Sequence, residues 1–222
     1  MIQPSLQIGG GDWAVKETKL LGTNPVLNRK LPVEIDFTNS TIGTRVNKEG
    51  FIENGPRNLL TFSEEIDNGA WSKTFSNVAT NVSISPNGNL TADRIDGTNT
   101  SVNYFRVFRN NLNLTSGIYT FSFYIKNNNL IGYVIVSFLD TSNNNSSEVF
   151  NYSSTNLGDW TRVSASINTA TTTLNNLNQI RVDFRKVSGN VTGIENIEFW
   201  GAQLEQGSTA TEYYPTTTRT NI

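Results

Sequence analysis

The chain of 222 residues contains no cysteine and no histidine, and only 16% of its residues are charged. Without cysteine, neither disulfide bonds nor thiolate metal sites can hold the fold together, so its stability must come from burial and subunit contacts. Without histidine, the chain lacks the commonest general base near neutral pH and the commonest ligand for transition metals. These absences exclude serine–histidine and cysteine–histidine catalysis, and they favour a binding or assembly role.

Long apolar runs are also missing, and no stretch approaches the ~20 residues that cross a bilayer as a helix. The first five residues show neither the basic region nor the apolar region of a secretion signal, so we expect production in the cytoplasm. The 17 basic and 19 acidic residues are interspersed and give a net charge of −2, which offers no electrostatic footprint for phosphates. We therefore expect neither nucleic acid nor a membrane as a partner.

Neutral polar residues take the place of charge on this chain, with 31 asparagines, 27 threonines and 20 serines. This composition is typical of many short strands that are joined by turns. The length suits one all-β domain with an appendage, since β-sandwiches and barrels often reach this size as one unit.

The appendage is expected at residues 1–57, which have few long apolar runs. This segment carries three consecutive glycines at 9–11, and it alternates only briefly, at Val33, Ile35 and Phe37. The pattern predicts an extended arm with one or two short strands or hairpins. Such an arm either lies on the main domain or becomes ordered on a partner, and a flexible tail is the alternative.

The main domain is expected at residues 58–222. In the segment 119–126, Tyr119, Phe121, Phe123 and Ile125 alternate with other side chains, which is the period of a strand with one face in a core. Further strands are expected at 102–108, 133–139, 148–152, 160–167, 179–187 and 195–204, and a single helical turn within 64–71. Short segments without a 3.6-residue stripe predict an antiparallel jelly-roll β-sandwich.

Several phrases of the sequence carry a family resemblance, which covers roughly residues 41–218. They stand at 44–53, 56–60 (Pro-Arg-Asn-Leu-Leu), 62–64 with 71–73, 158–162 (Gly-Asp-Trp-Thr-Arg) and 200–211 with 214–216. Together they resemble a module that recurs in structural proteins of tailed bacteriophages. The resemblance implies a jelly-roll similar to carbohydrate-binding modules, of the kind found in head fibres, spikes, capsid decorations and tail fibres.

A short arm with one jelly-roll looks more like a head fibre or capsid decoration than a tail fibre, and the asparagine-rich composition fits an AT-rich phage genome such as that of the crAss-like phages. The resemblance thus implies a non-enzymatic virion protein, a homotrimer whose arm docks on the major capsid protein and whose jelly-roll projects outward. The alternative is a glycan-binding adhesion module on the phage tail, directed at host or mucosal glycans. A tail-associated adaptor is a third hypothesis.

The expected capsid-anchoring residues are Trp13, Leu20 and Leu21. The glycines at 9–11 permit backbone conformations that are closed to other residues, and Trp13 supplies a large apolar side chain for a pocket on a partner. Apolar side chains of this kind are a liability when they are exposed, so we expect another surface to bury them. The alternative is that Trp13 covers an edge of this protein's own sandwich.

Sugar binding requires an aromatic face for the C–H side of a pyranose, with amides and carboxylates nearby for its hydroxyls. The candidate residues are Trp71, Trp160, Tyr104, Tyr124 and Tyr152, which have many asparagines as neighbours in the sequence, and Trp71, Tyr104 and Tyr124 are the ones we favour. Trp160 and Trp200 lie within strand patterns and are expected in the core. Trp71 occurs in a turn-rich segment, where core packing is the competing interpretation.

No cofactor and no metal site are expected, and the alternative, which the resemblance implies, is a structural calcium ion of the kind that related jelly-rolls often hold. Calcium needs several oxygen ligands, and no loop shows a dense alternation of carboxylates, although three aspartates occur near loops, at Asp93, Asp96 and Asp140. Glycoside hydrolysis needs a pair of carboxylates, and any chain of this size offers such pairs by chance, here among Asp67, Asp93, Glu148 and Asp183. We therefore expect that the protein is not an enzyme.

Overall fold

The computed structural model spans the full chain. It describes residues 58–129, 132–152, 158–172, 174 and 176–218, together with the backbone of four short strands before residue 58. The chain divides into two compact units, Met1–Asn54 and Gly55–Ile222, and each is described by itself.

The first unit contains two antiparallel pairs of short strands. β1 (Thr23–Asn24) pairs with β2 (Arg29–Lys30), and β3 (Thr44–Val46) pairs with β4 (Ile52–Asn54). The predicted anchoring residues Trp13, Leu20 and Leu21 lie outside the described residues.

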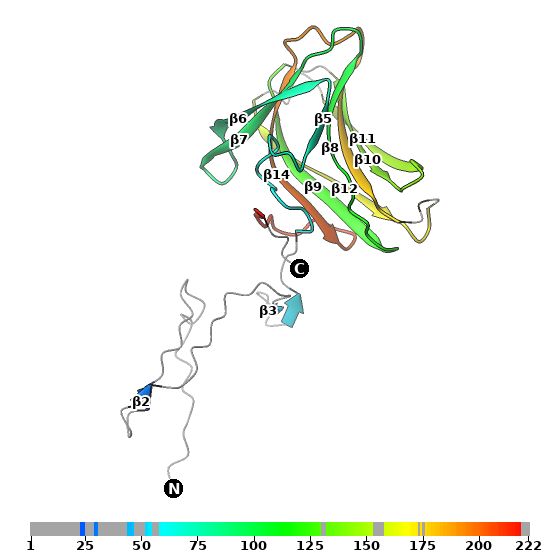
Figure 1. Ribbon diagram of the computed structural model, residues 1–222. Coiled ribbons are helices and arrows are strands. Elements are labelled where there is room, and N and C mark those ends of the chain that lie inside the picture. Colours follow the sequence, from blue (N-terminus) through cyan, green and yellow to red (C-terminus); the bar gives the residue numbers. More distant parts are fainter. Residues whose placement is uncertain are drawn as a thin grey trace. The chain divides into compact units, whose positions relative to one another are not determined.

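The second unit is a sandwich of two five-stranded antiparallel sheets (Figure 1), which confirms the predicted all-β jelly-roll. Sheet I has the strand order β11-β10-β13-β8-β5, and sheet II has the order β12-β9-β14-β7-β6. The strands are β5 (Ser72–Thr74), β6 (Ser76–Ile84), β7 (Leu90–Gly97), β8 (Tyr104–Arg109), β9 (Ile118–Asn127), β10 (Gly132–Leu139), β11 (Asn145–Tyr152), β12 (Trp160–Asn168), β13 (Gln179–Lys186) and β14 (Asn196–Gln206).

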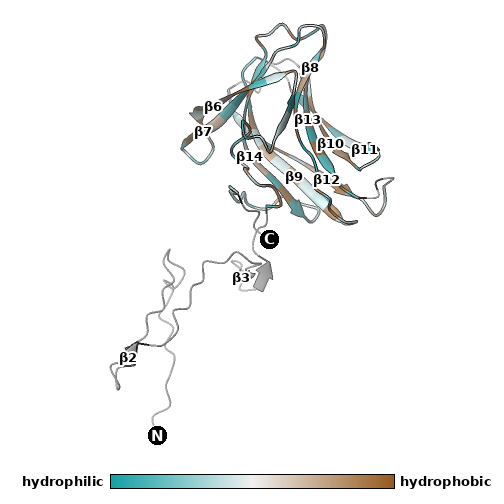
Figure 2. Cartoon of the chain, in the orientation of Figure 1, coloured by the Kyte–Doolittle hydropathy of each residue, from teal (hydrophilic) through white to brown (hydrophobic). Residues whose placement is uncertain are grey.

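Alternation along the strands separates the core from the outer faces (Figure 2). In β9, Phe121, Phe123 and Ile125 are completely buried, whereas Tyr124 and Lys126 on the opposite face are partly exposed. This is the period of two that the sequence shows.

Aromatic side chains from both sheets fill the core. Phe123 of β9 stacks on Phe199 of β14, with ring centroids 4.9 Å apart and an interplanar angle of 14°. On the other sheet, Phe105 and Phe184 pack at 5.2 Å. All four rings are completely buried, and truncation of such a ring to alanine typically costs about 3–5 kcal/mol of stability.

Asn58 connects the first residues of the sandwich with its last strand and its C-terminal segment. Its Nδ2 donates to the carbonyl oxygens of Ala202, at 2.8 Å, and Tyr214, at 3.1 Å. Its Oδ1 accepts the backbone N–H groups of Leu60, at 3.1 Å, and Leu204, at 3.2 Å. The side chain is completely buried. The segments at 56–60 and 200–216, which lie at the two ends of the predicted domain, therefore meet at this amide.

Two local predictions differ from the structure. The helical turn expected within 64–71 is replaced by successive tight turns, in which the N–H of Asn68 bonds to the carbonyl of Glu65 and the N–H of Trp71 to that of Asn68. The side chain of Asn68 also accepts the N–H of Ala70, a local bond that competes with helix formation. Strands β5, β6 and β7 were not predicted, because their residues are largely polar.

Candidate functional site

Trp71, Tyr104 and Tyr124, which were predicted for glycan binding, lie in three different parts of the sandwich. Trp71 lies in the core, Tyr124 lies on the outer face of sheet II, and Tyr104 lies on the outer face of sheet I. The structure therefore does not bring them together into one site.

Trp71 is only 2% exposed. Its indole N–H donates to the carbonyl oxygen of Phe62 at 2.9 Å, its ring meets the edge of Phe199 at 6.4 Å, and the guanidinium of Arg109 lies 5.5 Å from the ring. These contacts leave no ring face for a sugar, so the core-packing interpretation describes its place.

The ring of Tyr124 already packs against other side chains. Its ring lies 5.5 Å from Trp200 and 6.5 Å from Tyr213, and the guanidinium of Arg162 lies 5.4 Å from its centroid. Trp200 is 3% exposed. It was expected in the core, but it lies on the outer face of sheet II, opposite Tyr124 in the register.

The cover over Trp200 is Tyr213 of the C-terminal segment, with ring centroids 4.5 Å apart. The Tyr213 hydroxyl lies 2.7 Å from Ser63 Oγ and donates to Glu64 Oε1 at 3.1 Å. Burial raises the pKa of Tyr213, and burial likewise raises the pKa of Glu64. The C-terminal segment is thus fixed over this part of sheet II.

Trp160 differs from the other tryptophans in the described part of the chain. It was expected in the core, but it begins β12 opposite Lys126, on the outer face of sheet II, and it is partly exposed. Its indole N–H donates to the carbonyl oxygen of Ile84 at 3.0 Å, and Lys126 Nζ lies 5.4 Å from its ring centroid. The ring of Trp160 is therefore held in one orientation while part of it stays accessible to solvent.

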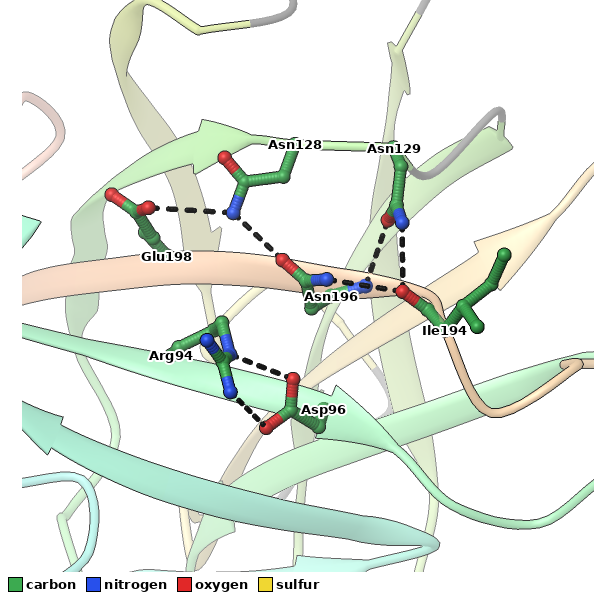
Figure 3. Close-up of polar contacts among 7 residues, drawn as sticks. All are labelled: Arg94, Asp96, Asn128, Asn129, Ile194, Asn196 and Glu198. Carbon is green, nitrogen blue, oxygen red and sulfur yellow. Dashed lines mark hydrogen bonds and ion pairs between the residues drawn. The ribbon is translucent and has the colours of Figure 1, made fainter. Parts of the chain in front are cut away.

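A polar group continues from Trp160 across β9 and β14. Lys126 Nζ pairs with Glu198 Oε2 at 2.5 Å. Asn128 Nδ2 donates to Asn196 Oδ1 at 2.7 Å and lies 3.4 Å from Glu198 Oε1 (Figure 3). We name Trp160, Lys126, Asn128, Asn196 and Glu198 the Trp160 face.

The loop after β9 is fixed against β14 at the border of the Trp160 face. Asn129 Nδ2 donates to the carbonyl oxygen of Ile194 at 2.7 Å, and its Oδ1 accepts the N–H of Asn196 at 3.0 Å. On β7, next to this group, Arg94 forms two hydrogen bonds with Asp96 (Figure 3). The loop amides are thus held in place before any ligand arrives.

The β6–β7 hairpin crosses the outer face of sheet II. β7 pairs with β14 only over Asp93–Asp96, and beyond that point the hairpin leaves the sheet. Ser83 donates to Glu198 from β6, across β7, and Thr91 accepts the indole N–H of Trp200 at 3.0 Å. The hairpin therefore forms one side of the Trp160 face.

A groove of about 510 Å³ runs along the side of the sandwich, between the edge strands β11 and β12. This volume lies in the range of small-ligand sites. The groove begins at the residue that follows Trp160. Its lining residues are Val149, Phe150, Asn151, Thr161, Arg162, Val163 and Ser164.

The aspartates considered for calcium are engaged elsewhere. Asp93 is 1% exposed and accepts two backbone N–H groups, and burial raises its pKa to about 6. Asp96 pairs with Arg94, and Asp140 accepts backbone N–H groups of its own loop. Within the described ranges, no group of three or more acidic side chains could hold a metal ion.

The carboxylates considered for hydrolysis come from separate elements of the chain, but two of them, Asp67 and Asp93, lie close together, since the backbone of Asp67 bonds to the Asp93 carboxylate. Asp67 is exposed in the turns before β5, and Asp93 faces inward on β7. Glu148 of β11 accepts the N–H of Ser166 at 3.2 Å, and Asp183 of β13 is 1% exposed on sheet I.

Trp160 was among the predicted candidates for sugar binding, whereas the other residues of the Trp160 face were not predicted. The alternation in β9 places Lys126 on the same face as Tyr124, so the position of Lys126 could have been predicted from the sequence. The neighbours Glu198 and Asn196 depend on the pairing of β9 with β14, which joins residues about 70 positions apart.

No family model and no curated protein matches the chain. Among solved structures, an exo-β-agarase has a TM-score of 0.51 at 6% identity, covering 68% of this chain and 25% of its own. A TmCBM61 module in complex with β-1,4-galactotriose has a TM-score of 0.48 at 13% identity, covering 68% and 99%. An enzymatically active domain of tailspike protein 4 of bacteriophage CBA120 has a TM-score of 0.47 at 12% identity, covering 68% and 21%.

The similarity to the agarase supports the sandwich fold and nothing further. The chain spans only about a fifth to a quarter of the lengths of the tailspike and agarase chains. The described residues form no helix that is long and apolar enough to span a membrane.

Proposed function

We propose that the sandwich is a glycan-binding module and that the Trp160 face is its binding surface. The observation that carries this proposal is the partly exposed indole of Trp160, held by its bond to Ile84 beside a carboxylate, an ammonium group and two carboxamides. An aromatic face can stack on the C–H side of a pyranose, while neighbouring polar groups bind its hydroxyls.

The pre-orientation of these groups supports the proposal. Asn128 and Asn196 are fixed by hydrogen bonds to each other, to the adjoining loop and to Glu198. Groups that are already ordered lose less side-chain entropy on binding, so more of their interaction energy appears as affinity. The groove that starts at Thr161 would give room for neighbouring residues of a longer chain.

The setting that we propose is a phage virion. In this proposal the protein is a head fibre or capsid decoration, a homotrimer whose arm at residues 1–57 binds the major capsid protein and whose sandwich projects outward. The resemblance of the phrases at 56–60 and 200–211 supports it. Asn58 holds the first and last residues of the sandwich together, which suits a domain attached at one end. The alternative is an adhesion module on the phage tail.

We also propose that the protein is not an enzyme. The support is that Asp93 and Asp183 are buried and that Glu148 binds a backbone N–H, so these three groups are not placed to act on a glycosidic bond. A glycosidase needs two carboxyl groups on either side of one bond.

The experiment is affinity electrophoresis of the full chain in neutral polysaccharides, with β-1,4-galactan, xylan and agarose as probes. We expect retardation by at least one probe and its loss in Trp160→Ala. The matched control is Tyr214→Ala, which removes another partly exposed aromatic ring, 41% exposed, from the C-terminal segment. Equal retardation of Trp160→Ala and the unchanged protein would contradict the proposal.

A further inference from the structure

The outer face of sheet I carries a cluster of ionisable side chains that glycan binding by the Trp160 face does not use. Arg106 Nε lies 2.7 Å from Asp183 Oδ1, and Arg181 Nε lies 3.4 Å and Arg185 Nη2 3.8 Å from Asp183 Oδ2. We name these four residues the Asp183 cluster. Three guanidinium groups surround one carboxylate on a chain whose net charge is −2.

The strand pairing fixes this arrangement. Arg181, Asp183 and Arg185 occupy alternate positions of β13, so all three project from the same face. The register places Arg106 of β8 directly opposite Asp183. The cluster is therefore built on two adjacent strands of a sheet, which hold their side chains more rigidly than a loop would.

One carboxylate does not balance the three cations, which leaves an excess of two positive charges. Asp183 is 1% exposed, while the side chains of Arg106, Arg181 and Arg185 are 17%, 23% and 29% exposed. Solvent thus reaches the guanidinium groups but not their counterion. Burial, together with repulsion from Arg106 and Arg185, lowers the pKa of Arg181 despite the attraction of Asp183.

Unused hydrogen-bonding capacity lies mostly with the arginines. Each guanidinium has five N–H donors, whereas a carboxylate has about four acceptor sites. The Nε atoms of Arg106, Arg181 and Arg185, and the Oδ1 of Asp183, are buried and make no well-aligned hydrogen bond among the described residues. A planar anion that accepts paired hydrogen bonds is the group that guanidinium clusters bind best.

An aromatic ring adjoins the cluster. The guanidinium carbons of Arg106 and Arg185 lie 4.3 Å and 5.1 Å from the ring centroid of Tyr104. Tyr133, opposite Arg185 in the register, is partly exposed. The Tyr104 ring also packs against Phe75, with ring centroids 5.4 Å apart, so Tyr133 gives the apolar surface next to the charges that a saccharide with an acidic group requires.

We propose that the Asp183 cluster is a second binding site, which takes the carboxylate or sulfate group of an acidic polysaccharide. The inference goes beyond the proposed function, since the two surfaces lie on the outer faces of opposite sheets and take different ligands. Failure of the neutral-glycan experiment at Trp160 would leave this site untouched.

The test is isothermal titration of the full chain at low ionic strength with alginate, dextran sulfate and unmodified dextran. Alginate supplies carboxylates and dextran sulfate supplies sulfates, so the two arms distinguish the sources of the anion. We expect one or both acidic polymers to bind and dextran not to bind. Arg185→Gln should weaken that binding about tenfold or more, since it removes a charge-assisted contact.

Arg94→Gln is the charge-matched control, because Arg94 is an exposed arginine on the other sheet that is paired with Asp96. It should weaken binding by less than about twofold. Asp183→Asn, which removes the counterion, should tighten binding, an effect that a merely structural ion-pair network would not produce. Equal losses in Arg185→Gln and Arg94→Gln, or no binding of either acidic polymer, would overturn the proposal. Self-association that Arg185→Gln abolishes, without polymer binding, would also overturn it.

Discussion

The indole N–H of Trp160 binds the carbonyl oxygen of Ile84, a residue 76 positions earlier in the chain. The bond joins β12 to the end of the β6–β7 hairpin, although these elements lie at opposite edges of sheet II. It fixes the ring in one orientation, and it fixes the hairpin over the outer face of the sheet.

The first prediction concerns this bond. Trp160→Phe keeps an aromatic ring but removes the N–H donor, so the hairpin should open more readily while the sandwich stays folded. Hydrogen exchange should become faster at residues 83–91 and remain unchanged in β9. A uniform increase over the whole domain would show that Trp160 supports the fold rather than the hairpin.

The second prediction concerns Trp71. Because its indole is 2% exposed and bonded to Phe62, Trp71→Ala should lower the free energy of unfolding by about 3–5 kcal/mol. Denaturant titration measures the loss, and Trp160→Ala serves as the comparison, with a much smaller expected change. A marginal loss for Trp71→Ala would contradict its placement in the core.

The third prediction concerns Asn58, whose amide makes four hydrogen bonds in a completely buried position. Asn58→Ala leaves several buried backbone groups without partners, at about 1–3 kcal/mol for each group that water cannot reach. We expect a fall in melting temperature of several degrees or more. Asn77→Ala, at an exposed position of β6, should leave it almost unchanged, and equal effects would refute the role given to Asn58.

The fourth prediction concerns pH. Burial raises the pKa of Asp93 from 3.8 to about 6, although backbone hydrogen bonds from Asn81, Ile66 and Asp67 oppose the shift. The folded state therefore holds a proton that the unfolded state releases, so this group's contribution to the unfolding free energy falls as pH rises from about 4 to about 6. The full fall corresponds to roughly 3 kcal/mol. Denaturant unfolding at several pH values in this range should show that the difference in unfolding free energy between the unchanged protein and Asp93→Asn changes with pH. A constant difference would contradict the raised pKa of Asp93.

Glu195 gives the opposite dependence in a lower pH window. Burial opposes ionisation, but hydrogen bonds from Lys186 and from the N–H and hydroxyl of Thr192 hold its pKa at about 2, below the ordinary value of 4.5. Its stabilisation is present above about pH 4.5 and is lost as pH falls toward 2. Glu195→Gln should remove this dependence. If its unfolding free energy falls with pH in this window as steeply as that of the unchanged protein, the result would count against the ion pair.

The arm gives a prediction for the virion setting. Deletion of residues 1–36 should leave the sandwich folded and abolish attachment to phage capsids, which co-sedimentation with purified particles measures. Retained attachment would exclude the arm as the anchor. Immunogold labelling of the sandwich on intact particles would separate the head from the tail, since a head fibre labels the capsid and an adhesion module labels the tail.

The sequence could predict the class of fold because the alternation in segments such as 119–126 and 179–187 depends only on neighbouring residues. It could not predict β6, whose residues are mostly polar and which leaves the sheet to cross its outer face. Nor could it place Trp160 and Trp200, since both faces of β12 and β14 carry large side chains. The covering of one indole and the exposure of the other depend on Tyr213 and on the hairpin, which are distant in sequence.

The concentration of positive charge on the outer face of sheet I could not be predicted from the sequence for a similar reason. Net charge and interspersed signs indicate no basic surface, yet the pairing of β8 with β13 places Arg106 beside two arginines that flank Asp183. A composition averages over both faces of every strand, whereas a ligand meets only one.

The most direct test of glycan binding by the Trp160 face is an NMR titration of the ¹⁵N-labelled chain with whichever neutral oligosaccharide retards it. The four tryptophans give four indole N–H signals, and Trp160→Phe assigns one of them. We predict that the Trp160 signal shifts on titration while those of the buried Trp71 and Trp200 stay in place. Shifts that spare Trp160, with binding intact, would contradict the account.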